Sequence, residues 1–127
     1  MLFERIESPG LAHYSYLVGD GHEAVVIDAR RDCQVYVDRA ARAGMRITHI
    51  LETHRNEDYV IGSTELAART GAEIRHADAQ YDYAYGSPVA DGQRWTVGEV
   101  TVRALACPGH TEGMMAYLLQ DAEGRTW

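Results

Sequence analysis

Glu52-Thr53-His54-Arg55-Asn56-Glu57-Asp58-Tyr59-Val60 has the layout of a metal-binding loop. In an extended loop, side chains two residues apart point the same way, so His54 and position 56 face one point and position 58 reaches it or its neighbour. This geometry explains why His-x-His-x-Asp-His binds metal ions. Here position 56 is Asn and position 59 is Tyr, which leaves His54 and Asp58 as the ligand-grade groups of the loop.

A second block, Cys107-Pro108-Gly109-His110-Thr111-Glu112-Gly113, follows a predicted strand. The Pro-Gly pair makes a sharp bend that presents His110 beside the first loop. The predicted metal site is therefore His54, His110 and Asp58, with ligands replaced at Asn56 and Tyr59. An amide oxygen suits Mg or Ca better than Fe or Zn, so Asn56 weakens a transition-metal site.

Composition sets the broad class. The 127 residues fit one globular domain over 1–127, with 46% hydrophobic and 24% charged residues. A net charge of −7 and scattered arginines argue against nucleic-acid and anionic-membrane partners. All twelve cationic side chains are arginine, which excludes a lysine nucleophile or Schiff base.

Cysteine use and the chain start indicate a cytoplasmic location. Cys33 and Cys107 do not form a disulfide framework by spacing, and sparse use is typical of a reducing cytosol. The first residues are too polar for a signal peptide, and no apolar run approaches the roughly 20 residues that span a bilayer. We expect Cys33 to be structural and Cys107 to be a small buried thiol rather than a persulfide carrier.

The local patterns predict strands alternating with two helices. Asp32 is the expected N-cap of the first helix, with Val35, Val37, Ala40 and Ala41 inward, and Ser63 is that of the second. The segment 77–92 is predicted to be a tyrosine-rich surface loop with one helical turn. The predicted helices are 33–43 and 64–70, and the predicted strands are 11–18, 23–27, 46–51, 72–75, 93–97, 99–106 and 114–119, followed by a turn at 121–124 and a short return strand at 125–127.

Three blocks carry a resemblance to a known family: Glu52 to Gly62, Tyr85 through Gly92, and Cys107 to Gly113. In order and spacing they resemble the N-terminal part of a metallo-β-lactamase-fold protein, and they are most similar to the persulfide dioxygenase branch with its rhodanese-fused relatives. The resemblance implies an α/β (α+β) fold, the N-terminal part of an αββα sandwich with a mixed sheet and helices on its outer face.

The same resemblance implies a mononuclear iron, held by the His-x-His region, the Pro-Gly-His histidine and a later aspartate. Carried over, these positions are His54, Asn56 and His110, with the aspartate expected beyond Trp127. The second-metal positions of the family fall on Asp58 and Tyr59. Within the chain as it stands, His54, His110 and Asp58 would supply two imidazoles and a carboxylate.

Three functions remain open. The leading hypothesis is persulfide dioxygenase-like activity on glutathione-type or other thiol persulfides in sulfide metabolism. The substitutions at Asn56 and Tyr59 favour a second, non-catalytic role in packing or partner binding beside a rhodanese-type domain, with no metal. The third is a zinc-dependent thioester hydrolase, whose two-zinc site would need both replaced histidines.

The remaining histidines and the tyrosines receive no site role. We expect His13, His22, His49 and His76 to be ordinary hydrogen-bonded residues. Tyr81, Tyr83 and Tyr85 alternate, so they either line a substrate lip or pack on their own domain. Asp28 and Asp32 are expected to bond loop amides. Because half a layered domain leaves a sheet face open, we expect a homodimer or a C-terminal half that covers it.

Overall fold

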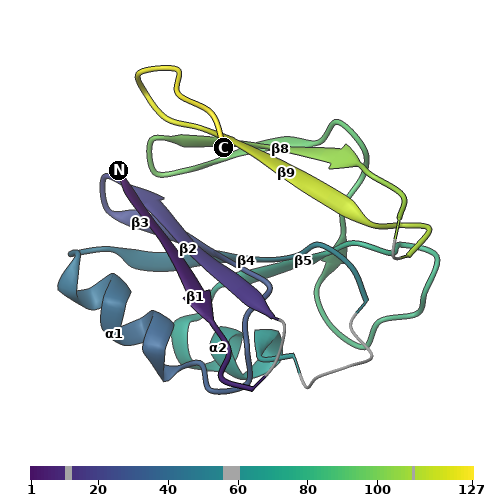
Figure 1. The fold of residues 1–127 in the computed structure, drawn as a ribbon, viewed down its shortest axis with the longest axis horizontal. Helices are drawn as coiled ribbons and strands as arrows, with labels where there is room; N and C mark the ends of the chain where they lie inside the picture. Colours follow the sequence, from purple (N-terminus) through teal and green to yellow (C-terminus); the bar gives the residue numbers. More distant parts are fainter. Residues whose placement is uncertain (11–12, 56–60, 110) are drawn as a thin grey trace.

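The computed structural model describes residues 1–10, 13–55, 61–109 and 111–127 (Figure 1). These residues form a six-stranded sheet in the order β1-β2-β3-β4-β5-β6 and a three-stranded sheet in the order β7-β8-β9. The bounds are β1 Leu2–Glu7, β2 Tyr14–Asp20, β3 Glu23–Ile27, β4 Arg46–Glu52, β5 Glu73–His76, β6 Ser87–Pro88, β7 Arg94–Val97, β8 Val100–Ala106 and β9 Met115–Gln120, with helices α1 Gln34–Arg42 and α2 Ser63–Thr70.

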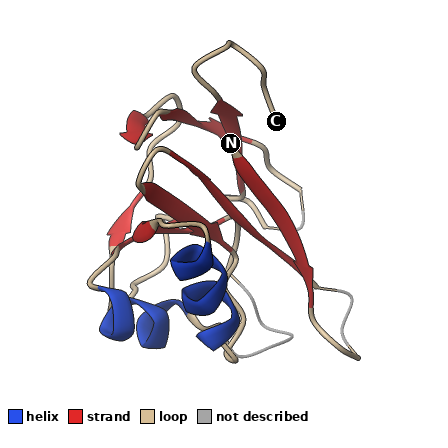
Figure 2. Cartoon of the chain, turned by 90° about the vertical axis from the view of Figure 1, so that its left-hand side faces the viewer, coloured by secondary structure: helices blue, strands red, loops and turns tan. Residues whose placement is uncertain are grey.

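The six-stranded sheet is mixed. Strands β1, β2 and β3 pair antiparallel, whereas β3, β4 and β5 pair parallel. A parallel pair needs a crossover connection, and α1 and α2 lie in the two crossovers, on one face of the sheet (Figure 2). The carboxyl ends of β3, β4 and β5 therefore meet at one edge, with Ile27 opposite Leu51 and Glu52 opposite His76.

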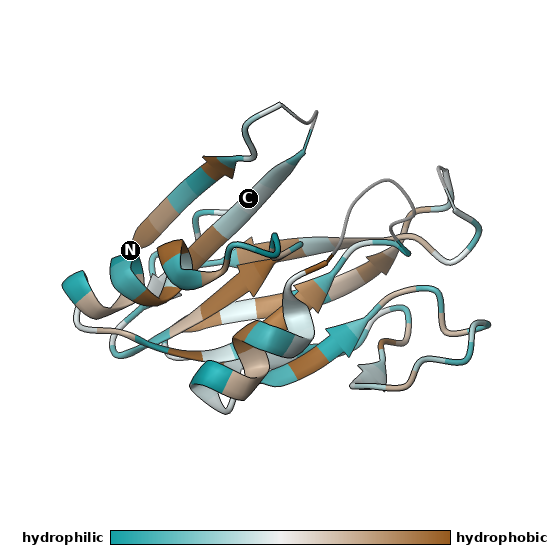
Figure 3. Cartoon of the chain, turned by 90° about the horizontal axis from the view of Figure 1, so that it is seen from below, coloured by the Kyte–Doolittle hydropathy of each residue, from teal (hydrophilic) through white to brown (hydrophobic). Residues whose placement is uncertain are grey.

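Two large apolar clusters and one smaller one hold the layers of the described residues together. The first lies between the helices and the six-stranded sheet, and it includes Leu17, Val26, Tyr36, Ile50 and Leu66. The second joins the inner faces of the two sheets, and its buried members are Val18, Val25, Ile27, Leu51, Val97, Val100, Val102 and Leu119. Hydropathy colouring shows hydrophobic residues along the strands of this layered arrangement (Figure 3). The chain thus supplies part of both sheets of the predicted α/β fold.

The outer face of β7-β8-β9 lacks a helix layer within the described part of the chain. Arg103 and Leu118 are opposite each other on this face, and Leu118 is exposed. The expected homodimer or C-terminal half would cover such a face, and it remains a prediction. Neither described helix is long and apolar enough to cross a membrane.

Most predicted elements are confirmed with small shifts at their ends. The hairpin about Gly98 and the strands at 23–27 and 46–51 form as expected. Strand β1 was not predicted, and the strand expected over 11–18 runs from Tyr14, while residues 11 and 12 lie outside the described part. The loop 77–92 contains the short β6 and no helix. At the end of the chain, Leu119 and Trp127 exchange two backbone hydrogen bonds.

Both predicted helix caps are wrong. The N-cap of α1 is Cys33 rather than Asp32, and no side chain caps it. The N-cap of α2 is Gly62, because the Ser63 hydroxyl bonds the Glu52 carboxylate instead of a helix amide. On α1, Tyr36 and Ala40 are buried, whereas Ala41, predicted to be inward, is exposed. Long-range hydrogen bonding therefore overrides the local capping preference.

The core between the two sheets is expected to dominate stability. We predict that Leu51→Ala lowers the free energy of unfolding by about 2–5 kcal/mol, because it leaves a cavity at a side chain with no exposed surface. Leu118→Ala is the matched control and should change it by about 0.5 kcal/mol or less. Urea unfolding followed by circular dichroism measures both, and equal losses would contradict this packing.

Candidate metal centre

Three buried carboxylates stand where three parallel strands end. Asp28 follows β3, Glu52 is the last residue of β4, and Asp78 comes two residues after β5. Their exposed fractions are 7%, 1% and 0%. Because a buried carboxylate is costly unless it accepts hydrogen bonds, each of them must organise the backbone and side chains around it.

Asp28 anchors the start of the first loop. Its Oδ1 accepts the Thr53 backbone N–H at 2.8 Å, and its Oδ2 accepts the Thr53 hydroxyl at 2.7 Å. The Thr53 oxygen lies 2.8 Å from Nδ1 of His54. The expectation that Asp28 bonds a loop amide is confirmed. Its backbone is in the left-handed region at φ 54°, which an Asp side chain tolerates better than most.

This chain of bonds favours one tautomer of the His54 ring. Since the Thr53 hydroxyl proton is directed at Asp28, the Thr53 oxygen accepts a hydrogen bond from Nδ1–H of His54. In that tautomer the lone pair is on Nε2, which is then the ring nitrogen that could bind a metal ion. Burial raises the pKa of the Asp28 carboxyl, and the two hydrogen bonds from Thr53 oppose that shift.

Asp78 ties the first loop to the second. Its Oδ2 accepts the Arg55 backbone N–H at 2.6 Å and the Thr111 hydroxyl at 2.9 Å, and its Oδ1 accepts the Gly113 N–H at 3.0 Å. Its own N–H donates to the Gly113 carbonyl. One fully buried side chain therefore joins the residue after His54 to the block that contains position 110. The sequence interpretation missed Asp78, although it follows a strand just as Asp28 does.

The two loops also meet through their backbones. The Met115 N–H donates to the Thr53 carbonyl at 2.7 Å, at the start of β9. At Gly113 an added Cβ would lie 2.7 Å from the Asp78 Cα, so only glycine permits this approach. The predicted proximity of the two blocks is therefore seen in the residues that flank position 110.

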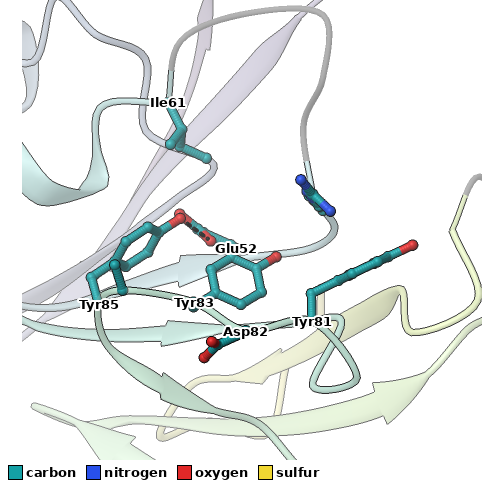
Figure 4. A pocket seen from close by; sticks show the side chains of 8 residues that line it. Glu52, Ile61, Tyr81, Asp82, Tyr83 and Tyr85 are labelled. Carbon is teal, nitrogen blue, oxygen red and sulfur yellow. Dashed lines mark hydrogen bonds between the residues drawn. The ribbon is translucent and has the colours of Figure 1, made fainter.

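Glu52 is at the base of a pocket next to this junction (Figure 4). It accepts hydrogen bonds from the hydroxyls of Ser63 at 2.8 Å and Tyr85 at 2.9 Å. The pocket has a volume of about 310 Å³. Its lining residues are Glu52, Arg55, Ile61, Tyr81, Asp82, Tyr83, Ala84 and Tyr85. Tyr81, Tyr83 and Tyr85 line this pocket, and Tyr83 also packs on its own domain, with its ring centre 3.8 Å from that of His76.

Only one of the predicted metal ligands lies within the described residues. His54 is described, whereas Asp58, Asn56, Tyr59 and His110 lie outside the described residues. Among the residues that are described, no three His, Cys, Asp or Glu side chains form a group that could hold a metal ion. The ligand set His54, His110 and Asp58 therefore stays a prediction.

Cys107 and Cys33 have opposite environments. The Cys107 thiol is exposed, so the prediction that it is a buried thiol is wrong. Its N–H donates to the Met114 carbonyl at the mouth of the second loop, which directs the side chain to the surface. Cys33 is buried at the start of α1, as expected of a structural cysteine, and burial raises the pKa of its thiol.

The other histidines match ordinary structural roles where the structure records their contacts. His13 is bonded through Nδ1 to the Ser8 hydroxyl at 2.7 Å, and burial lowers the pKa of its ring. His49 is 3.0 Å from the Thr48 hydroxyl, and His76 is buried against Tyr83. None of them lies in the junction that Asp78 forms.

Comparison with known proteins decides the family. The model of the metallo-beta-lactamase superfamily matches residues 8–123. The chain belongs to this superfamily. A metallo-beta-lactamase from Staphylococcus aureus superposes with a TM-score of 0.89 and 29% identity, over 98% of this chain and 40% of that one. ETHE1 from Myxococcus xanthus superposes with a TM-score of 0.86 and 29% identity, over 94% of this chain and 54% of that one.

Curated superfamily relatives include hydrolases. The hydroxyacylglutathione hydrolase of Acidiphilium cryptum is 36% identical over 87% of this chain and 46% of its own length. The atrochrysone carboxyl ACP thioesterase of Aspergillus fumigatus is 36% identical over 86% of this chain and 36% of its own length. The chain thus spans less than half of these two relatives.

Superfamily members generally bind zinc or iron. The bond between Thr53 and Nδ1 of His54 would leave Nε2 of the ring for a metal ion. With His110 and Asp58, the sequence offers the two imidazoles and one carboxylate of a mononuclear iron site. Two zinc ions would need imidazoles at positions 56 and 59, where Asn and Tyr stand. The predicted donor set would suit one metal ion rather than two.

Asp78 is expected to control the junction of the two loops. We predict that Asp78→Asn lowers the free energy of unfolding by roughly 2 kcal/mol or more, because the amide nitrogen faces donors that then lose their acceptor. Amide hydrogen exchange at Arg55 and Gly113 should speed up. Asn tolerates the φ of 52° found here, so backbone strain does not confound the result.

Asp121→Asn is the matched control. Asp121 also accepts backbone N–H groups, from Glu123 and Arg125, but it lies in the turn after β9. Asp121→Asn should leave the hydrogen-exchange rates of the Arg55 and Gly113 amides unchanged. Unaltered exchange at both amides in Asp78→Asn would refute the joining role.

Glu52 makes stability depend on pH. Burial raises the pKa of its carboxyl above the ordinary 4.5, against hydrogen bonds from Ser63 and Tyr85. Because the folded state binds this proton more tightly, the stabilisation is fully present below about pH 4.5 and is lost as the pH rises through the raised pKa. Glu52→Gln has no such proton. The unfolding free energy of wild type minus that of Glu52→Gln should therefore decrease from about pH 4 to pH 7 in urea titrations, and a flat difference would exclude this assignment.

Proposed function

We propose that this chain is part of a persulfide dioxygenase-like metalloenzyme that acts on glutathione-type or other thiol persulfides. The observation that carries the proposal is the Asp28–Thr53–His54 chain of hydrogen bonds, which prepares one imidazole for a metal. Asn56 and Tyr59 stand at positions where a two-metal site would have imidazoles. The likeness to ETHE1 from Myxococcus xanthus supports the same branch.

A single iron would be held by His54, His110 and Asp58 of this chain, with a further carboxylate expected from the family pattern. When bound, iron would supply the redox chemistry that lets dioxygen react with a persulfide. The overall reaction balances as RSSH + O₂ + H₂O → RSH + H₂SO₃. In it the outer sulfur loses four electrons to dioxygen and the S–S bond breaks, leaving the thiol.

The described residues would act by positioning. Asp28 and Thr53 hold the His54 ring in one orientation and one tautomer. Asp78 keeps the residue after His54 against the second loop. The pocket beside Glu52 and Tyr85 has room for the non-reacting part of a small thiol compound. A rigid support of this kind is what a precise site requires.

A zinc-dependent thioester hydrolase is the second candidate, and 36% identity to a hydroxyacylglutathione hydrolase and to an ACP thioesterase favours it. A non-catalytic domain beside a rhodanese-type partner is the third, favoured by Asn56 and Tyr59. The three candidates differ in metal content and in the bond that reacts, so one set of measurements separates them.

The purified chain should be reconstituted with Fe(II) without oxygen, desalted and analysed for metal. We expect about one iron per chain and dioxygen consumption with glutathione persulfide. Zinc retention with hydrolysis of a glutathione thioester would favour the hydrolase instead. A chain with neither metal after reconstitution would leave only the non-catalytic role.

Thr53 provides a matched pair of variants. Thr53→Val has nearly the same shape but no hydroxyl, so His54 loses the bond that orients it. Iron affinity should fall about 10- to 100-fold, as is typical when the partner of a ligating histidine is removed. Thr53→Ser keeps the hydroxyl and should retain most of the affinity. Equal affinities in wild type, Thr53→Val and Thr53→Ser, measured by competition with a chelator, would contradict the ligand role of His54.

A further inference from the structure

We propose that Arg55, Tyr81 and Tyr83 form a carboxylate-binding wall of the pocket beside His54, so that the site selects thiol compounds that carry a carboxylate. This inference deepens the proposed function and rests on it for the thiol part of the substrate. The carboxylate part follows from the pocket itself. It makes Arg55 a specificity-determining residue rather than a ligand of the metal.

Arg55 is a cation without a carboxylate partner among the described residues. Its guanidinium lies over the Tyr81 ring, 4.6 Å from the ring centre, and it forms none of the ion pairs found in that part of the chain. By contrast, Arg39 pairs with Glu4 at 2.9 Å and Arg69 with Glu65 at 2.8 Å. An aromatic ring attracts a cation without neutralising it. Within the described residues, the charge of Arg55 is therefore not neutralised by a carboxylate, in a chain of net charge −7.

The backbone of Arg55 is fixed although its side chain is exposed. Its N–H donates to the fully buried Asp78 at 2.6 Å, one residue after the oriented His54. The side chain therefore starts from a defined point beside the reacting centre. A small molecule whose thiol lies at the predicted metal site could therefore place a second group against Arg55.

Tyr83 adds an unused donor to the same pocket. Its hydroxyl is buried and has no hydrogen-bond partner among the described residues, an arrangement that is normally avoided. Its ring stacks on His76, and Figure 4 shows it between Glu52 and Tyr81. Burial and the nearby charges of Glu52 and Asp78 raise the pKa of the phenol to about 12, while the Arg55 charge opposes that shift. The hydroxyl thus keeps its proton at neutral pH and lies within the electrostatic reach of Arg55.

An unpaired guanidinium and an unsatisfied hydroxyl together call for an anionic acceptor. A carboxylate suits them, because its two oxygens accept from a guanidinium fork and a hydroxyl at once. The acidic residue at the base of the pocket is already engaged, since Glu52 accepts bonds from Ser63 and Tyr85. The volume of about 310 Å³ is at the lower end for small-molecule sites, which fits a compact thiol compound.

The test is a binding titration that needs no metal and no turnover. S-methylglutathione, which has two carboxylates and an unreactive sulfur, is titrated into the ¹⁵N-labelled chain, and amide shifts at Arg55, Tyr81 and Tyr83 are followed by NMR. Its dimethyl ester is the matched probe without carboxylates. We expect the acid to bind about tenfold or more tightly than the ester.

Three variants locate the effect. Arg55→Gln should weaken binding of the acid about tenfold and leave the ester unchanged, which abolishes the preference. Tyr83→Phe should weaken binding of the acid severalfold without loss of thermal stability, because the hydroxyl that it removes has no partner among the described residues. Arg94→Gln removes an exposed positive charge outside the pocket lining and should leave the preference intact.

The outcomes are decisive in both directions. Equal binding of acid and ester, no binding of either at millimolar concentration, or equal losses in Arg55→Gln and Arg94→Gln would each overturn the proposal. The proposed function fails separately, through absent metal or absent dioxygen consumption, because this titration measures neither.

Discussion

The buried carboxylate of Asp78 is the constraint on which the rest of the site depends. A carboxylate with no exposed surface must be surrounded by donors, and here the donors come from two segments more than fifty residues apart, at Arg55 and at Thr111 to Gly113. If these segments were apart, the buried Asp78 carboxylate would lose its hydrogen-bond donors. The need to satisfy one side chain therefore brings the two loops together.

The sheet makes this arrangement possible. Because β3, β4 and β5 run parallel, their carboxyl ends carry Asp28, Glu52 and Asp78 to one edge. Asp28 and Asp78 are the non-glycine residues with positive φ in the described part of the chain. Such backbone conformations concentrate at functional sites, where surrounding bonds hold them in place. In this structure those bonds are the ones that orient His54 and join the loops.

Much of the fold was predictable because it follows from short-range pattern. The hairpin about Gly98 and strand β4 needed only alternation and turn chemistry. Strand β1 was missed because it is a largely exposed edge strand with a polar sequence. The cap at Ser63 was misassigned because its hydroxyl bonds a residue eleven positions away. The residues next to Ser63 in the sequence do not indicate that its hydroxyl bonds Glu52.

The candidate site also has a part that was predictable from the sequence and a part that was not. The contact between the two blocks was predicted from spacing and resemblance, and the role of Asp28 from its place after a strand, whereas the ligand role of His54 stays a prediction. Asp78 and the Arg55–Tyr81–Tyr83 wall were not, because their roles arise from contacts that only the folded chain brings together. Asn56, Asp58, Tyr59 and His110 lie outside the described residues and remain predictions.

The most direct test is an NMR measurement of scalar couplings across hydrogen bonds, from the amide nitrogens of Arg55 and Gly113 to the carboxyl carbon of Asp78. We expect a resolved coupling from both amides to this one carbon, the larger from Arg55 because its bond is the shorter, 2.6 Å against 3.0 Å. Absence of coupling from both amides, with couplings in the surrounding sheet clearly visible, would contradict the claim that Asp78 joins the two loops.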